Sequence, residues 1–249
     1  MKALITGAST GIGRDMARIL HREGHELYLV ARNTELLKEL CCELNNEPHI
    51  FSMDLSVPEN CFELYDSLKN ENIDIVVNNA GFGAFGYFSD VELGRELNMV
   101  DLNIKSVHIL TKLFLKDFEQ RDFGYILNVA SSAAFLSGPL MSVYYATKSY
   151  VLRLSTALHE ELRRKKSKVY VGVLCPGPVD TEFNRTAGVS FNLKSLTSKR
   201  VAEYAIKSMF RRKRVIIPGI TIKLGVFAQR FVPTGLLLKI AYNIQKNKG

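Results

Sequence analysis

Short apolar runs, often rich in β-branched residues, recur along this chain and alternate with longer stretches that have a helical period. The runs predicted as strands are ALIT (3–6), ELYLVA (26–31), HIFSM (49–53), IDIVVN (73–78), YILNVA (125–130), KVYVGVLC (168–175) and RVIIP (214–218). Several of them are apolar throughout instead of alternating with polar residues. This pattern is typical of strands that are buried on both faces of a sheet.

The stretches between these runs predict helices over residues 13–23, 34–45, 58–70, 91–121, 142–166 and 198–210. Strands that alternate with helices pair in parallel through right-handed crossovers. We therefore predict an α/β fold, a Rossmann-type doubly wound parallel sheet with helices on both faces. Ligands of such sheets bind outside the carboxyl ends of the strands.

The length and composition predict one domain over residues 1–249. A chain of 249 residues that is 47% hydrophobic can bury a sizeable core, and no linker, repeat or low-complexity segment interrupts it. Met1 leads directly into a strand-like run, and no apolar run approaches the roughly 20 residues that a membrane span requires. We expect a cytoplasmic protein. The histidines and cysteines lack the spacing of metal ligands, so no metal site is predicted.

The basic charge is concentrated near the C-terminus. Residues 199–249 hold 12 of the 33 Lys and Arg residues beside one acid, Glu203, whereas the rest of the chain has 21 basic and 24 acidic residues. Within the tail, residues 219–249, a helical pattern places Leu237, Ile240, Ala241 and Ile244 on one face, with Lys239, Lys246 and Lys248 elsewhere. The tail could form a pocket wall or subunit contact, or bind an anionic membrane peripherally. We predict no nucleic-acid partner, because the tail is apolar and the chain has no recognised nucleic-acid motif.

A glycine-rich turn, TGASTGIG (6–13), follows the first predicted strand and opens a helix. Glycines permit positive φ and let the backbone approach a phosphate, whose charge the free N–H groups of the helix start can bind. A plain tight turn is the alternative. The second strand is followed by Arg32, which suits a 2′-phosphate and favours NADP over NAD; a solvated surface arginine is the alternative.

The segment SVYYATKSYVLRL (142–154) sets two tyrosines ahead of a lysine. On a helix, Tyr144 lies four residues and Tyr145 three residues before Lys148, so both rings reach its neighbourhood. The spacing alone does not decide which of the two tyrosines takes part in catalysis.

Six motifs together resemble the short-chain dehydrogenase/reductase family, over about residues 2–181. They are TGASTGIG, NNAG (78–81), Asn103 within VDLNIKS, NVASS (128–132), YxxxK (144–148) and PGPVDT (176–181). The resemblance implies the catalytic set Asn103, Ser131, Tyr144 and Lys148, with Ser132 as the alternative to Ser131. Tyr145 is then a neighbour of the catalytic tyrosine.

The resemblance also implies where a nicotinamide cofactor would bind. The expected contacts are Gly7, Ser9, Thr10, Gly11, Ile12, Gly13, Arg32, Asp54, Leu55, Asn79, Ala80, Gly81, Tyr144, Lys148, Pro176, Gly177, Val179 and Thr181. Asp54 has an alternative as a turn or helix-cap residue.

Reduction of a ketone by hydride requires a proton for the new alkoxide. A phenol with an ordinary pKa near 10 must be tuned to act near neutral pH, and lowering this pKa by three units needs about 4 kcal/mol. One ammonium about 4 Å away supplies roughly that amount at an effective dielectric constant near 20. We therefore expect Lys148 to lower the pKa of Tyr144, Ser131 to polarise the carbonyl, and Asn103, by resemblance, to hold a relay water.

Residues 182–197, EFNRTAGVSFNLKSLT, lack a clean period and predict a substrate lid. Phe183 and Phe191 could face a hydrophobic substrate, or simply anchor the loop to the core. The predicted protein is an NADP(H)-dependent oxidoreductase that interconverts a carbonyl and a secondary alcohol, and a homo-oligomer by resemblance. The alternative is a non-enzymatic NADP-binding sensor or scaffold.

Overall fold

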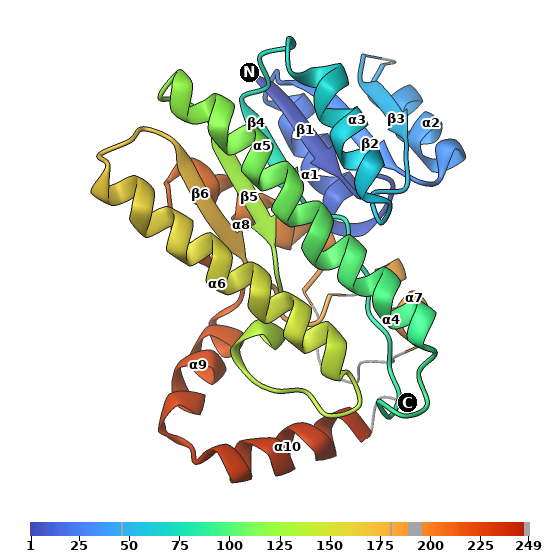
Figure 1. Ribbon diagram of the computed structural model, residues 1–249, viewed down its shortest axis with the longest axis vertical. Coiled ribbons are helices and arrows are strands. Elements are labelled where there is room, and N and C mark those ends of the chain that lie inside the picture. The colour runs from blue at the N-terminus through green and yellow to red at the C-terminus, as the bar shows by residue number, and fades with distance from the viewer. Residues whose placement is uncertain (46, 180, 189–195, 247–249) are drawn as a thin grey trace.

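The computed structural model describes residues 1–45, 47–179, 181–188 and 196–246. Within these residues, seven strands form one parallel sheet in the order β3-β2-β1-β4-β5-β6-β7, of which Figure 1 labels β1 to β6. They are β1 (Lys2–Thr6), β2 (Glu26–Ala31), β3 (His49–Ser52), β4 (Ile75–Asn78), β5 (Tyr125–Val129), β6 (Tyr170–Leu174) and β7 (Val215–Ile216). The strand order reverses between β1 and β4, which is where a doubly wound sheet opens a crevice for ligands.

Helices cover both faces of the sheet, as predicted. One layer holds α1 (Gly11–Arg22), α2 (Thr34–Glu43) and α8 (Ser198–Phe210), and the other holds α3 (Pro58–Leu68), α5 (Val107–Gln120) and α6 (Ser142–Arg164). The apolar runs explain this arrangement. In β1, for example, Leu4 packs in the core of the second layer and Ile5 in that of the first, and both are fully buried.

The predicted helix over 91–121 is divided in the structure. It consists of α4 (Leu93–Val100), a π-helical segment (Asp101–Ser106) and α5. The wide π turn contains Asn103, whose side chain is fully buried. Short π segments inside α-helices occur frequently at functional sites, and the hydrophobic period carries no signal for them.

The segment after β6 carries a short helix, α7 (Glu182–Ala187), at the start of the predicted lid. Leu196 returns to form a parallel bridge with Val179, so the two ends of the segment lie together. Phe191 lies outside the described residues, and the function of the segment as a lid stays a prediction.

The tail contains two helices, α9 (Ile220–Ala228) and α10 (Thr234–Lys246), joined by a 3₁₀ turn at Gln229–Phe231. Figure 1 shows both helices at one end of the molecule, away from the sheet. On α10, the side chains of Ala241 and Gln245 are buried, whereas Ile240 and Ile244 of the predicted apolar face are exposed. Lys248 lies outside the described residues. None of the described helices is both long and apolar enough to cross a bilayer.

Candidate active site

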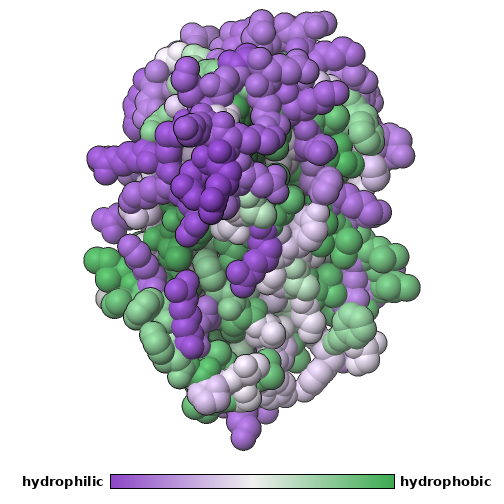
Figure 2. Space-filling view, turned by 60° about the vertical axis from the view of Figure 1, so that its left-hand side comes forward, coloured by the Kyte–Doolittle hydropathy of each residue, from purple (hydrophilic) through white to green (hydrophobic). Residues whose placement is uncertain are grey.

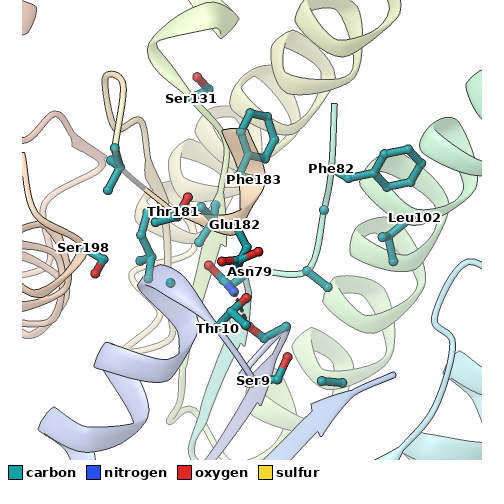
Figure 3. Close-up of a pocket in the computed structure, with 18 of the residues that line it drawn as sticks. Ser9, Thr10, Asn79, Phe82, Leu102, Ser131, Thr181, Glu182, Phe183 and Ser198 are labelled. Atoms are coloured by element: carbon teal, nitrogen blue, oxygen red, sulfur yellow. Dashed lines mark hydrogen bonds between the residues drawn. The ribbon is translucent and has the colours of Figure 1, made fainter. Parts of the chain in front are cut away.

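A cleft of about 1210 Å³ opens at the carboxyl ends of β1, β2, β4, β5 and β6. It exceeds the usual range of small-molecule sites, roughly 300–1,000 Å³, which suits an extended ligand beside a second one. Its lining includes every predicted site residue except Gly13 and Asn103. Figure 3 shows Ser9, Thr10 and Asn79 toward one end of the cleft and Ser131 toward the other, with Phe183 between them in this view.

The glycine-rich turn is shaped by close backbone approach. Gly7 and Gly11 have positive φ, +63° and +54°. A Cβ on Gly13 would lie 2.3 Å from the carbonyl oxygen of Gly7, so Gly13 lets the start of α1 pack onto the turn and does not itself face the cleft. The Asn79 side-chain amide donates to the carbonyl oxygens of Thr6 and Gly7, both at 3.0 Å, and fixes the turn against β4. The resulting cradle at a helix N-terminus fits a pyrophosphate.

Two arginines, Arg32 and Arg14, are among the residues that line the cleft. Arg32 is largely exposed and lies 3.8 Å from the Asp54 carboxylate. Arg14, one residue beyond the glycine-rich turn, was missed by the sequence analysis; its guanidinium pairs with Glu43 at 3.2 Å, and its buried Nε lacks a hydrogen-bond partner among the described residues. A basic residue directly after the glycine-rich turn is the sequence signal that could have identified Arg14 as a cleft residue. Asp54 lines the cleft and also accepts hydrogen bonds from the backbone N–H and hydroxyl of Ser56, so its turn-residue alternative holds too.

Ser131, Tyr144 and Lys148 meet at the other end of the cleft. The first turns of α6 carry the tyrosine and the lysine, and the end of β5 carries the serine. The Lys148 amine lies over the Tyr144 ring, 6.0 Å from its centroid, and donates to the carbonyl oxygen of Val129 at 3.0 Å. The Ser131 side chain is hydrogen-bonded to that of Tyr144, and its Oγ also accepts from the backbone N–H of Ala133. Ser132 lines the cleft as well, and its backbone N–H donates to Pro176 at 2.7 Å.

The expected direction of the Tyr144 pKa is wrong for the protein alone. Burial raises the pKa of Tyr144 above its ordinary value, and the hydrogen bond with Ser131 only partly opposes this. Burial also lowers the pKa of Lys148, to about 8, because the ammonium loses its hydration. The attraction between an ammonium and a phenolate would lower the pKa of Tyr144. The loss of hydration of both groups has a larger effect and sets the direction of both pKa shifts.

Asn103 lies behind the cleft wall and does not line it. Its Oδ1 accepts from the backbone N–H of Phe82 at 3.1 Å, and its Nδ2 donates to the carbonyl oxygen of Phe82 and to the Thr147 hydroxyl. These bonds connect the loop after β4 to the helix that carries Lys148. A Cβ on Gly81 would lie 2.8 Å from Asn103 Oδ1 and 3.2 Å from the Lys148 amine, so the packing here requires glycine.

Apolar side chains surround the Tyr144 ring. Phe183 of α7 packs on it with ring centroids 5.2 Å apart, and Tyr145 meets it edge to face at 6.1 Å. The cluster also contains Phe82, Ala133 and Met141, which line the cleft. Phe183 therefore contacts Tyr144 directly. The Tyr145 hydroxyl instead accepts a hydrogen bond from Gln245 of α10, a contact between distant segments that no local pattern could reveal.

No group of three or more potential metal ligands occurs among the residues that the structure describes. The polar groups that the chain itself brings to this end of the cleft include the Tyr144 phenol, the Ser131 hydroxyl and the Lys148 amine.

A sequence model described as short chain dehydrogenase matches residues 1–189. The chain belongs to the short-chain dehydrogenase family. It is 31% identical over 224 residues to an uncharacterized oxidoreductase of Staphylococcus epidermidis, covering 89% of this chain and 96% of that protein. It is 30% identical over 253 residues to the human very-long-chain 3-oxoacyl-CoA reductase, covering 98% of this chain and 80% of that protein.

A solved structure of the family has the same fold. The short-chain dehydrogenase from Sphingobium yanoikuyae in complex with NADPH superposes with a TM-score of 0.84 and 30% identity, covering 95% of this chain and 94% of that one. The predicted fold and family are confirmed, and the chain is an oxidoreductase of this family.

Proposed function

We propose that the protein is an NADP(H)-dependent oxidoreductase that interconverts a hydrophobic ketone and a secondary alcohol. The observation that carries this proposal is the meeting of Ser131, Tyr144 and Lys148 in one cleft with a glycine-rich turn at a helix N-terminus. The roles of these residues, the homo-oligomeric state and the cytoplasmic location stay predictions.

NADP fits the residues of the cleft. The glycine-rich turn would hold the pyrophosphate, and the exposed guanidinium of Arg32, with Arg14 beside it, would receive the 2′-phosphate. The relative from Sphingobium yanoikuyae was solved with NADPH, which supports this preference. When bound, the reduced cofactor supplies a hydride to the substrate carbonyl carbon.

The protein supplies the proton and the polarisation. Because its pKa is raised, the Tyr144 phenol stays protonated at physiological pH and can donate to the alkoxide, which is a much stronger base than phenolate. The Ser131 hydroxyl would stabilise charge on the carbonyl oxygen. Lys148, with a pKa of about 8, is mainly cationic at pH 7 and would stabilise the phenolate that remains. Asn103 connects the loop after β4 to α6, the helix that carries Tyr144 and Lys148.

The substrate side of the cleft favours an apolar molecule. Phe82, Met141, Tyr145 and Phe183 would pack along a chain or ring system next to the reacting carbon. The human relative is a reductase of very-long-chain 3-oxoacyl-CoA. We propose a ketone on a long acyl chain, or one of comparable apolar bulk, as the substrate class.

Purified protein with NADPH and a series of 3-oxoacyl thioesters and simple ketones tests the proposal. We expect NADPH oxidation whose kcat/KM rises with chain length, and weaker use of NADH. Arg32→Ala should weaken NADPH binding about tenfold and leave NADH binding nearly unchanged, because only NADPH carries the 2′-phosphate. Tight NADPH binding without oxidation by any substrate would instead favour a sensor or scaffold.

A further inference from the structure

Helix α9 is apolar but unburied. Its sequence, ITIKLGVFA, has apolar residues around the whole circumference, yet none of its residues is buried. A helix that is hydrophobic all round normally lies inside a protein or in lipid. Among the described residues, α9 is therefore more exposed than its apolar sequence predicts.

Both helices of the tail expose rows of large apolar side chains. Along α9 and the 3₁₀ turn, a spacing of i, i+4, i+7 and i+11 places four side chains on one helical face: Ile220, Leu224, Phe227 and Phe231. All four are exposed large hydrophobics, and the rings of the last two pack together at 5.4 Å. Along α10, the exposed side chains of Leu236, Ile240 and Ile244 recur at a spacing of four. The side chains of Ala241 and Gln245, by contrast, are buried. The tail surface, so defined, consists of Ile220, Leu224, Phe227, Phe231, Leu236, Ile240 and Ile244.

Side-chain hydrogen bonds link the described part of the tail to the body of the protein. Gln245 donates to the Tyr145 hydroxyl, and the hydroxyls of Tyr242 and Tyr87 lie 3.0 Å apart. On the face drawn in Figure 2, hydrophobic side chains gather on the lower half, the end where α9 and α10 lie in Figure 1, and hydrophilic side chains cover most of the upper half. Apolar surface of this extent usually marks an interaction site.

Two partners could cover the tail surface, a second copy of this protein or a lipid membrane, and the charge of the tail favours one of them. Lys223, Arg230, Lys239 and Lys246 are exposed on the same segments, and within the described residues none of them forms an ion pair. The sequence has no acidic residue after Glu203. A second copy docking this face on itself would bring like charges together. An anionic lipid surface would receive the hydrophobic side chains and neutralise the cations.

We propose that α9 and α10 dock the protein on the surface of an anionic membrane, with the tail surface inserted at the level of the lipid headgroups. The tail also meets the cleft, since Ile222 packs against Gly177 and Gln245 bonds to Tyr145. Docking therefore sets the substrate end of the cleft beside the lipid. That last step rests on the proposed function, because it assumes an apolar substrate.

Flotation of the full-length protein with vesicles tests the docking directly. We use phosphatidylcholine vesicles with and without phosphatidylserine and expect the protein to float strongly with the anionic set. The double substitution Phe227→Ser and Phe231→Ser should lower the partition coefficient by at least tenfold. The control Phe62→Ser, which changes an exposed phenylalanine on α3, should leave it unchanged. Lys239→Glu should weaken binding to the anionic vesicles about fivefold, with Lys116→Glu on α5 as the matched control.

Two outcomes would overturn the proposal. One is wild-type protein that floats with neither vesicle; the other is a serine double variant that floats like the wild type. If the wild type does not float and the serine variant converts a sedimenting dimer to a monomer, the surface covers a second copy instead. Tyr144→Phe should float normally, so failure of the proposed reaction and failure of docking remain distinguishable. Unchanged thermal melting of each variant excludes unfolding as the cause.

Discussion

The body and the tail of this protein use apolar residues in opposite ways. In β1 the side chains of Ala3, Leu4 and Ile5 are fully buried between two layers of helices, whereas in α9 no side chain is buried and Ile220 remains 79% exposed. The body thus completes its core within the chain, and the tail does not. This difference separates the part whose stability and chemistry are self-contained from the part that needs a partner surface.

Removing the phenol oxygen from the body should have the largest effect. We expect Tyr144→Phe to reduce kcat by about a thousandfold, because the alkoxide loses its proton donor, while NADPH affinity is retained. Tyr145→Phe should largely spare kcat, since its hydroxyl bonds to the tail. Steady-state kinetics and NADPH fluorescence titration measure both quantities. Equal losses in the two variants would contradict the assignment of Tyr144.

A glycine pair contrasts the packing of the two regions. Gly13→Ala should destabilise the protein by about 3 kcal/mol and weaken NADPH binding, because its Cβ would clash with the backbone of Gly7. The matched change Gly225→Ala meets no atom within 4 Å. It should stabilise α9 by up to about 1 kcal/mol, the difference in helix propensity. Urea unfolding measures both; a destabilised Gly225→Ala variant would show that the tail is packed more closely than described.

The buried Lys148 should make the stability of the body depend on pH. Its folded-state pKa of about 8 lies below the unfolded value of 10.5, so the unfolded chain binds more protons between these values and stability rises with pH there. A shift of this size corresponds to about 3 kcal/mol. Lys148→Met should be more stable than the wild type at pH 7, and this advantage should vanish near pH 10.5. An advantage that stays constant with pH, in urea unfolding without cofactor, would contradict burial of the charge.

The smallest effect is expected where the tail contacts the body. Gln245→Leu removes the hydrogen bond to Tyr145 and should cost about 1 kcal/mol of stability. Because Tyr145 lines the cleft, we expect a severalfold higher KM for the apolar substrate with little change in kcat. A variant with an unchanged KM and a halved kcat would show that the contact acts on Tyr144 instead.

The fold and most of the cleft could be predicted because their signals are local. Buried strands are apolar runs, and the glycine-rich turn, Asn79, Ser131 and the Tyr144–Lys148 spacing are short motifs at strand ends. The π turn at Asn103 left no trace in the hydrophobic period, so one long helix was predicted there.

Properties set by tertiary surroundings could not be predicted in the same way. The sequence shows that Tyr144 and Lys148 are neighbours, but their pKa directions follow from burial by distant elements. Likewise, the pattern of α10 predicts a helix with apolar residues but not which side of it faces the body. That side follows from tertiary contacts such as the hydrogen bond from Gln245 to Tyr145. An exposed apolar stripe and a buried one look alike in a linear pattern.

The bare backbone of Gly177 has a consequence for how this protein can vary. Ile222 occupies the space that a side chain at residue 177 would need, since a Cβ there would lie 2.7 Å from the isoleucine. A larger residue at position 177 thus requires a smaller one at position 222 of α9. The two positions form a single steric unit and should be exchanged only as a pair when the cleft is redesigned.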